Sequence, residues 1–231
     1  MTATTPTSPA APVALPARGA WLGREGFADT LQRQLAARDA LADGTGAPVV
    51  FAVEHPPVLT LGRRGTRDDV LWTDAQLAEA GVEVCASPRG GQVTLHAPGQ
   101  LVVYPVVRIG WRIRAHIVGL GEAAAALLIG LGIPEAEFRL EQPGVWVGPR
   151  KIASIGVHVS RGITVQGIAI NLDPDETLFG ALVSCGLSGV QMTSVRRETG
   201  AAPSVQDTAG AFVRLWAARY GAEVTWPSDS P

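Results

Sequence analysis

One lysine and one cysteine are the residues of this chain best suited to catalysis. Lys151 is the only lysine, since the other eighteen of the 19 Lys and Arg residues are arginines. A lysine amine can lose its proton when its surroundings change, whereas an arginine guanidinium cannot. Cys185 follows an apolar run that breaks into Cys-Gly-Leu-Ser-Gly, so we expect its sulfur on a turn. A thiol beside a cation is the setting of a nucleophile.

Each of these residues also has a structural interpretation. Lys151 could reflect no more than an arginine-rich composition, and Cys185 could be an ordinary thiol. The second cysteine, Cys85 in "VEVCAS", is flanked by strand residues, and we expect it to be an inert core cysteine.

The stretch "SPRGGQVTLHAPGQ" (87–100) is the next candidate for chemistry. Arg89 is suited to holding an anion or a carbonyl group, and His96 to donating a hydrogen bond to a developing oxyanion. The alternative is a hairpin in which Gly90 and Gly91 are turn residues. No helix opens at these glycines, so the stretch does not match a nucleotide-binding loop.

Small residues on two adjoining strands predict a groove. Gly156 lies on one strand, and Gly167 and Ala169 alternate on the other, with Ile155 and Ile168 expected as walls. Such a slot suits a linear apolar chain, although close helix packing is an alternative. We expect Gly167→Val to fill the slot and leave the fold intact, because strands accept β-branched residues.

Strand alternation places Lys151 on the face of Ile155 and opposite Ser154 and Gly156. A β-bulge, or a strand that begins after Lys151, is therefore required if these residues share one site.

The remaining titratable residues give no clear site. We interpret His55 and His116 as structural or surface residues and assign His158 no role. The basic turn "LGRRGTR" (61–67) is interpreted as a solvated loop. No group of residues has metal-ligand spacing, so we expect no metal.

The pattern of predicted elements favours an α+β fold: one domain with a largely antiparallel mixed sheet packed by helices. Helices are expected at 24–42, 73–81, 112–131 and 204–220, and strands at 48–55, 82–87, 91–97, 100–109, 144–148, 151–160 and 162–172. We expect the domain to span 18–226, between disordered tails at 1–17 and 227–231.

Composition excludes several functional classes. A net charge of -2 provides no excess of cations for nucleic acid. Two cysteines do not form a disulfide framework, and the apolar runs are shorter than a bilayer crossing. The N-terminal stretch lacks the features of a signal peptide, so we expect a cytoplasmic protein that does not enter membranes.

Four stretches, taken together, resemble the lipoyl/octanoyl transferases of lipoate biosynthesis. They are "EHPPVLTLGRRG", "RGGQVTLHAPGQLVVYP", "RKIASIGVHV" and "CGLSGVQMTS", in the order found in the family. The resemblance covers about residues 20–225. It implies a fold shared with biotin and lipoate protein ligases, and the domain 18–226 as the catalytic domain.

The resemblance also implies the site. The family's catalytic pair falls on Cys185 and Lys151. Two departures are Ala97, where the family usually has glycine after the histidine, and Ser184, where it often has proline. The acyl pocket implied by the family is lined by Arg89, Gly90, Gly91, Gln92, Val93, Thr94, Leu95, His96, Ser154, Ile155, Gly156, Gly167, Ile168 and Ala169.

The implied activity moves an octanoyl group from octanoyl-acyl carrier protein to a lysine of a lipoyl domain, through an octanoyl thioester on Cys185. The acceptors would be lipoyl domains of 2-oxoacid dehydrogenases and of the glycine cleavage system. No cofactor is expected, and the enzyme is expected to be a monomer. The alternatives are an ATP-dependent lipoate or biotin protein ligase on the same fold, and a non-catalytic acyl-chain binding protein.

Overall fold

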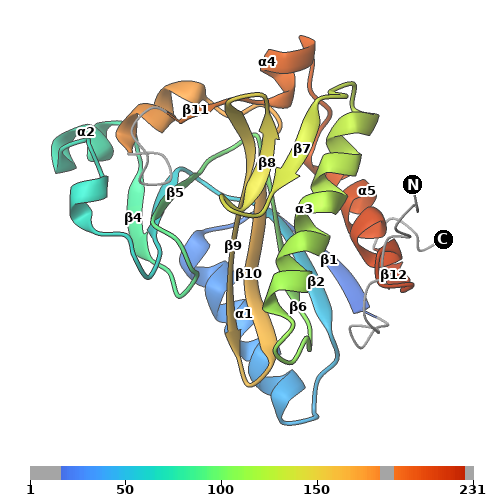
Figure 1. Cartoon of the computed structure of the whole chain (residues 1–231). Helices are drawn as coiled ribbons and strands as arrows, with labels where there is room; N and C mark the ends of the chain where they lie inside the picture. Colours follow the sequence, from blue (N-terminus) through green and yellow to red (C-terminus); the bar gives the residue numbers. More distant parts are fainter. Residues whose placement is uncertain (1–16, 183–189, 227–231) are drawn as a thin grey trace.

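The computed structural model describes residues 17–182 and 190–226. In these residues a nine-stranded sheet and a three-stranded sheet are accompanied by three long helices (Figure 1). The predicted α+β fold with a mixed, largely antiparallel sheet is confirmed.

The large sheet is antiparallel through its centre and parallel only at its margins, where β1 pairs with β2 and β12, and β11 pairs with β9. Across the sheet the strands are β12 (Val224–Thr225), β1 (Ala17–Arg24), β2 (Val49–Glu54), β6 (Gln100–Val106), β10 (Ile163–Asn171), β9 (Arg150–Ser160), β8 (Gly144–Val147) and β7 (Ala136–Arg139), with β11 (Gln191–Met192) beside β9.

The small sheet lies over one face of the large one. Its order is β4 (Glu83–Ala86), β3 (Val58–Leu61) and β5 (Val93–His96). Strand β3 follows Pro56 and Pro57 directly and was not predicted, because paired prolines usually end a strand. Here the prolines separate β2 from β3, so that two consecutive strands belong to different sheets.

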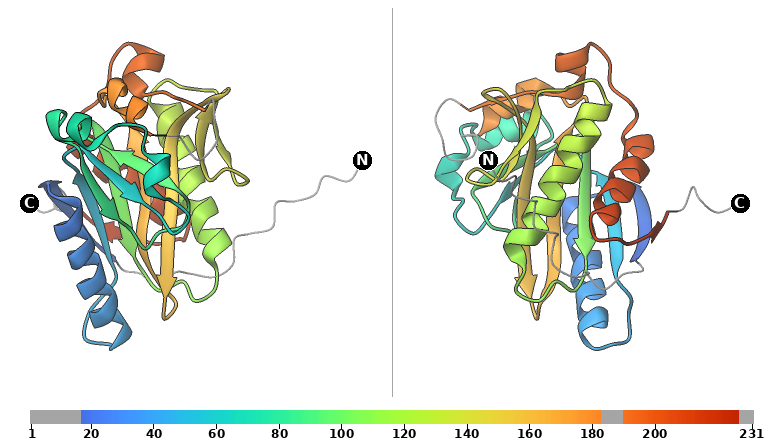
Figure 2. Two further views of the ribbon diagram at one scale, coloured as in Figure 1. Left: turned by 90° about the vertical axis from the view of Figure 1, so that its left-hand side faces the viewer. Right: turned by 45° about the vertical axis from the view of Figure 1, so that its right-hand side comes forward.

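The long helices pack on both faces of the large sheet. Helices α3 (Ile113–Gly130) and α5 (Val205–Ala218) cover one face, and α1 (Phe27–Ala42) lies on the other, beside the small sheet (Figure 2). The short elements are α2 (Asp74–Glu79), α4 (Val195–Thr199) and the 3-10 turns η1 (Arg67–Asp69) and η2 (Glu176–Ala181).

Helix α3 has the length and mean hydropathy of a membrane span, contrary to the expectation that the apolar runs are too short. Half of its most apolar window is buried inside the protein, against α5 and strands β7 to β9. Its apolar character therefore matches the packing of a core helix, because a helix apolar on most sides must be buried.

Between α3 and α5 lies a buried histidine without a hydrogen bond. His116 is 1% exposed, and its ring meets the ring of Trp216 edge-on at 6.3 Å. Both ring nitrogens lack a hydrogen-bond partner among the described residues. Burial lowers the pKa of His116 from 6.5 to about 4. The fold therefore holds this imidazole neutral.

His116 is expected to weaken the fold as the pH falls. Between pH 6.5 and about 4 the unfolded chain binds a proton at His116 and the folded chain does not. The free energy of unfolding therefore declines as the pH falls through this range. The loss at pH 5 is about 2 kcal/mol. His116→Phe does not titrate, so its stability relative to wild type should rise by about that amount from pH 7 to pH 5. Urea unfolding at both pH values measures this, and parallel pH profiles would contradict it.

Candidate active site

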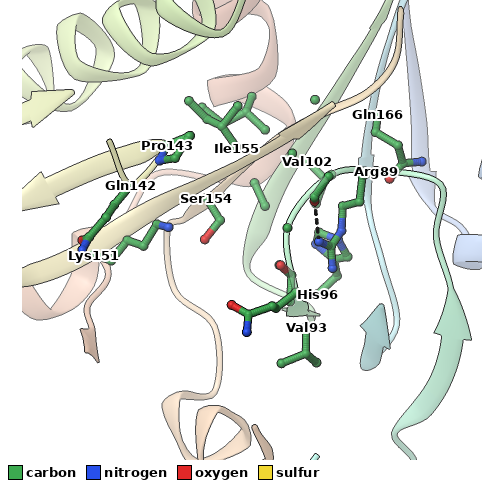
Figure 3. Close-up of a pocket in the computed structure, with 18 of the residues that line it drawn as sticks. Arg89, Val93, His96, Val102, Gln142, Pro143, Lys151, Ser154, Ile155 and Gln166 are labelled. Carbon is green, nitrogen blue, oxygen red and sulfur yellow. Dashed lines mark hydrogen bonds between the residues drawn. The ribbon is translucent and has the colours of Figure 1, made fainter. Parts of the chain in front are cut away.

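A cavity of about 430 Å³ lies between the two sheets (Figure 3). The small sheet contributes residues 89–94 and His96, and the large sheet contributes Lys151, 154–156 and 166–169. All the expected pocket residues in the described chain line this cavity except Leu95, and so does Lys151.

Leu95 faces the other side of the small sheet. Side chains alternate along β5, so Leu95 points away from its neighbours Thr94 and His96. It is 2% exposed within a separate apolar cluster with Leu59, Leu178 and others, and it borders only a smaller second cavity. The second cavity shares Val93, Thr94, Ser154 and Ala169 with the main one, and the expected place of Leu95 in the acyl pocket stays a prediction.

A β-bulge brings Lys151 to the cavity. Strand β8 pairs Val145 with Ala153 but Trp146 with Lys151, so Ile152 is an extra residue without a partner on β8. The extra residue reverses the alternation, and Lys151 shares the side of the sheet with Ser154. Of the two arrangements that the sequence required, the structure has the bulge, since β9 already begins at Arg150.

The Lys151 side chain lies flat on the neighbouring strand. A Cβ atom on Gly144 would be 2.4 Å from Lys151 Cε and 3.2 Å from Nζ, so glycine at this position leaves the space for the lysine stem. The Nζ atom lies 5.3 Å from the centre of the Trp146 ring, within the range of a cation–π contact. Lys151 is 4% exposed, and its contacts with Gly144 and Trp146 hold the amine at the cavity.

Small residues form the floor of the cavity along β9 and β10. Ser154 pairs with Ala169 and Gly156 with Gly167, so two short side chains and two glycines share one face of the sheet. Ile155 and Ile168 pair on the opposite face, where they pack with the main core. The sequence suggested that the two isoleucines form side walls. In the structure they instead meet the cavity from beneath.

Arg89 is fixed within the protein. Its guanidinium, on a residue only 5% exposed, donates to the carbonyl and hydroxyl oxygens of Thr60 and to the carbonyl of Gly90. These bonds tie the 89–91 loop to strand β3. The structure thus gives Arg89 a role in shaping the cavity wall.

The basic turn at 62–65 packs against the same loop and is not a simple solvated loop. Main-chain N–H groups of Arg63 and Arg64 donate to the carbonyls of Arg89 and Gly91. A Cβ on Gly62 would lie 2.5 Å from the Gly91 carbonyl oxygen, so a side chain there would push the two segments apart. The turn therefore supports the cavity wall, and Arg64 also lines the cavity.

His96 is buried and neutral beside the cavity. Burial, His55 and the Arg89 charge hold its pKa well below the usual range. Its ring stacks on Phe27, and its Nδ1 atom has no hydrogen-bond partner among the described residues. A neutral imidazole carries one N–H group, so His96 can donate a single hydrogen bond without contributing charge.

His55, which was expected to be a structural or surface residue, holds Tyr104 at the cavity by a hydrogen bond. His55 donates from Nδ1 to the carbonyl of Glu25 at 2.7 Å, so its Nε2 accepts from the Tyr104 hydroxyl at 2.9 Å. Burial raises the pKa of Tyr104, which stays a phenol. Tyr104 lines the cavity, as do Val102, Gln142, Pro143 and Gln166, none of which was among the expected pocket residues.

Cys185 and Ser184 lie outside the described residues. The flanking residues Leu182 and Met192 both line the small second cavity together with Ser154 and Ala169. Beyond the gap, Met192 pairs with Lys151.

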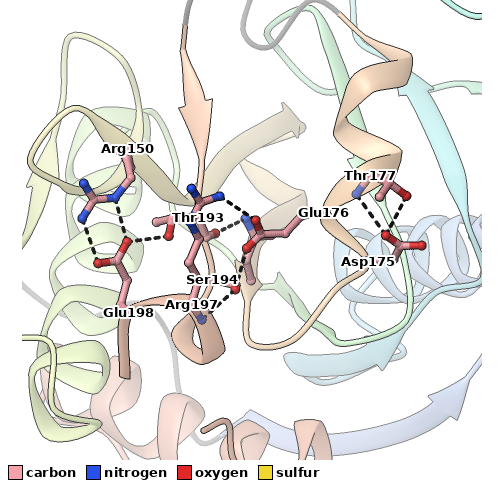
Figure 4. Close-up of polar contacts among 9 residues, drawn as sticks. Arg150, Asp175, Glu176, Thr177, Thr193, Ser194, Arg197 and Glu198 are labelled. Carbon is pink, nitrogen blue, oxygen red and sulfur yellow. Dashed lines mark hydrogen bonds and ion pairs between the residues drawn. The ribbon is translucent and has the colours of Figure 1, made fainter. Parts of the chain in front are cut away.

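Hydrogen bonds and ion pairs connect described segments that precede and follow residues 183–189 (Figure 4). Glu176 in η2 accepts hydrogen bonds from Ser194 and Arg197 at 2.9 and 2.7 Å. Glu198 in α4 accepts two bonds from Arg150, the neighbour of Lys151, and these bonds lower the pKa of Glu198. These bonds tie η2 to Ser194 and α4, and α4 to the strand that carries Lys151.

Cys85 is partly exposed on β4 and does not belong to the core, contrary to expectation. Burial and the neighbouring Glu83 raise the pKa of its thiol. A raised pKa means less thiolate at neutral pH, so the expected low reactivity has a different cause from the one proposed.

The departure at Ala97 fits the backbone without strain. Among the described residues only Arg161 and Gln166 combine a side chain with a positive φ. The following turn closes with a bond from the Gln100 N–H to the Ala97 carbonyl, and Gly99 supplies the left-handed position (φ 85°). Glycine at 97 is therefore not required for the turn that carries His96.

Comparison with known proteins identifies the family of this chain. Residues 28–216 match the model of the lipoyl protein ligase A/B catalytic domain family. The octanoyltransferase of Desulfovibrio desulfuricans is 40% identical over 83% of this chain and 82% of its own, and that of Chloroflexus aurantiacus is 41% identical over 78% and 82%. The chain belongs to the octanoyltransferase family.

Solved structures show that this octanoyltransferase-family chain shares its fold with ligases. A lipoate-protein ligase A bound with ATP superposes with a TM-score of 0.72 at 16% identity, covering 94% of this chain and 90% of the ligase. The biotin protein ligase of Leishmania major gives a TM-score of 0.53 at 13% identity, covering 87% and 73%. The expected biotin/lipoate ligase-like fold is confirmed.

Proposed function

We propose that this chain transfers an octanoyl group from octanoyl-acyl carrier protein to the acceptor lysine of lipoyl domains, through a thioester on Cys185. The observation that supports this most is the slot floored by Ser154, Gly156, Gly167 and Ala169, which begins at the only lysine. A narrow floor of small residues suits a straight acyl chain. The octanoyltransferase relatives support the same substrate.

The proposal places Cys185 beside Lys151. Cys185 is three positions after Leu182 in the sequence, a reach of at most about 10 Å. Leu182 itself borders the cavity that Ser154 and Ala169 line. An ammonium within about 4–6 Å would favour the Cys185 thiolate, which is the nucleophilic form.

In the first half-reaction the Cys185 thiolate attacks the carbonyl carbon of the carrier thioester. The His96 N–H can donate to the oxyanion that forms. The carbon–sulfur bond to the carrier breaks, and the departing carrier thiolate takes a proton from the Lys151 ammonium. The products are the octanoyl-Cys185 thioester, free carrier thiol and a neutral Lys151 amine.

In the second half-reaction the acceptor lysine of the lipoyl domain attacks the octanoyl-Cys185 carbonyl. The neutral Lys151 amine takes the proton released by the attacking nitrogen, and the carbon–sulfur bond breaks. An amide forms, and the thiolate–ammonium pair is restored. A thioester lies above an amide in free energy, so no ATP is consumed. We further propose that the reaction takes place in the cytoplasm, in a monomer.

The decisive experiment is intact mass after incubation with octanoyl-acyl carrier protein. We expect one octanoyl group on the wild type and on Cys85→Ala, and none on Cys185→Ala. Cys85→Ala is the matched control, because it removes a thiol whose pKa is raised. An adduct that survives in Cys185→Ala would contradict the proposal. Acylation of lipoyl domains that requires ATP and persists in Cys185→Ala would instead identify a ligase.

A further inference from the structure

We infer that Gln166 forms the end wall of the acyl slot and sets the longest chain the enzyme accepts. The inference rests on the proposed acyl transfer and adds a determinant of substrate length. Of the β10 residues that line the cavity, Gln166 lies furthest along the strand from Ala169, which pairs with Ser154. Three strand residues correspond to about 10 Å, comparable with an extended eight-carbon chain.

The slot is closed at the level of Gln166. On β9 the partner of Gln166 is Val157, whose carbonyl accepts a hydrogen bond from the Gly90 N–H at 3.1 Å. The loop from the small sheet therefore meets the large sheet one residue beyond Gly156. Ser87, at the start of the same loop, lies 3.4 Å from the Gln166 side-chain oxygen. A chain running along the floor would meet this junction.

The Gln166 side chain is held in place by an unusual backbone. Its φ is 64°, and it is the only such residue other than glycine inside a described strand. Its main-chain N–H donates to the side-chain oxygen of Gln34 in α1 at 2.7 Å, and its own amide group donates to the same oxygen at 3.3 Å. The register of the Ile168–Val103 pair places Gln166 opposite Pro105 on β6. Proline has no N–H group to donate to Gln166.

The positive φ of Gln166 also determines which substitutions can test the role of its side-chain amide. Glycine adopts a positive φ without strain, so Gln166→Gly removes the wall and suits the backbone. Gln166→Asn keeps a polar residue that tolerates this conformation but withdraws the amide by one methylene. Arg161→Gly is the matched control: Arg161 has φ 52°, lies in the β9–β10 turn and does not line the cavity.

The experiment compares octanoyl with decanoyl and dodecanoyl carrier donors by kcat/KM, and the binding of free fatty acids from hexanoic to dodecanoic acid. In Gln166→Gly the decanoyl-to-octanoyl ratio should rise about tenfold or more, with a smaller rise in Gln166→Asn and none in Arg161→Gly. The preferred fatty acid should lengthen in parallel. A purely structural Gln166 would change the melting temperature and leave these ratios alone.

Unchanged ratios in a folded Gln166→Gly or Gln166→Asn would overturn the inference. Its failure is distinct from that of the proposed function. If the wild type forms no octanoyl-enzyme, the proposed transfer fails, and the fatty-acid binding series still decides whether Gln166 limits the length of the slot.

Discussion

Replacing Lys151 with arginine is expected to reduce octanoyl transfer at least about a hundredfold, because a shift of ~1 Å in a reacting group can have this effect. The lysine stem lies against Gly144, where an added carbon would come within 2.4 Å of Cε. The planar guanidinium is wider than an ammonium. Because the side chain lies tightly against β8, the guanidinium would be displaced from the position of the lysine amine.

The two half-reactions should respond differently to this change. An arginine charge can still stabilise a thiolate, so we expect the octanoyl-enzyme to form at a reduced rate. Arginine does not give up a proton at any relevant pH, so it can neither protonate the departing carrier nor accept the proton of the attacking amine. We therefore expect the transfer to the lipoyl domain to be the slower step, as single-turnover measurements of each half-reaction would show.

A neighbouring residue provides the matched control. Arg150→Lys makes the opposite exchange one position away, on a side chain paired with Glu198. It should lower the transfer rate only slightly, since Arg150 does not line the cavity. Rates near wild type in both half-reactions of Lys151→Arg would mean that Lys151 supplies only charge, or has no role in the reaction.

Gly167→Val is expected to destabilise the fold, and not only to fill the slot. A Cβ at Gly167 would lie 2.1 Å from the Val103 carbonyl oxygen and 3.0 Å from Pro105 Cδ. Both atoms belong to strand β6, so they can move only if the pairing of β6 with β10 is disturbed. We expect a loss of about 3 kcal/mol or more, the upper range for overpacking. The melting temperature should fall by roughly 6–12 °C.

The matched variant is Gly156→Ala, on the partner strand. Its added carbon would lie 3.0 Å from Arg89 Cδ and 3.3 Å from the Gly90 carbonyl oxygen. The arginine stem can shift a few tenths of an ångström, so this variant should melt within a few degrees of wild type and lose octanoyl binding. A Gly167→Val protein with wild-type stability would contradict the packing argument, and full octanoyl binding by Gly156→Ala would place the acyl chain elsewhere.

The sequence alone was sufficient for the main elements and for most of the pocket. Helices α1, α3 and α5 lie within a few residues of their predicted ranges, since long periodic segments with clear ends are determined locally. The stretches around Arg89, Ser154 and Gly167 were expected to form one pocket, and they line one cavity. The pairing of Cys185 with Lys151 stays a prediction.

Only the tertiary structure could decide the register and the burial. The sequence showed that a bulge was one way to bring Lys151 to the floor, but its place at Ile152 depends on the pairing of β8 with β9. Gln166 was not identified because its left-handed backbone and its hydrogen bond to Gln34, a residue distant in sequence, leave no local pattern. Gly167 was expected to accept a side chain because strand propensity is a local property. Its closeness to the Val103 carbonyl arises from the neighbouring strand, which no local pattern specifies.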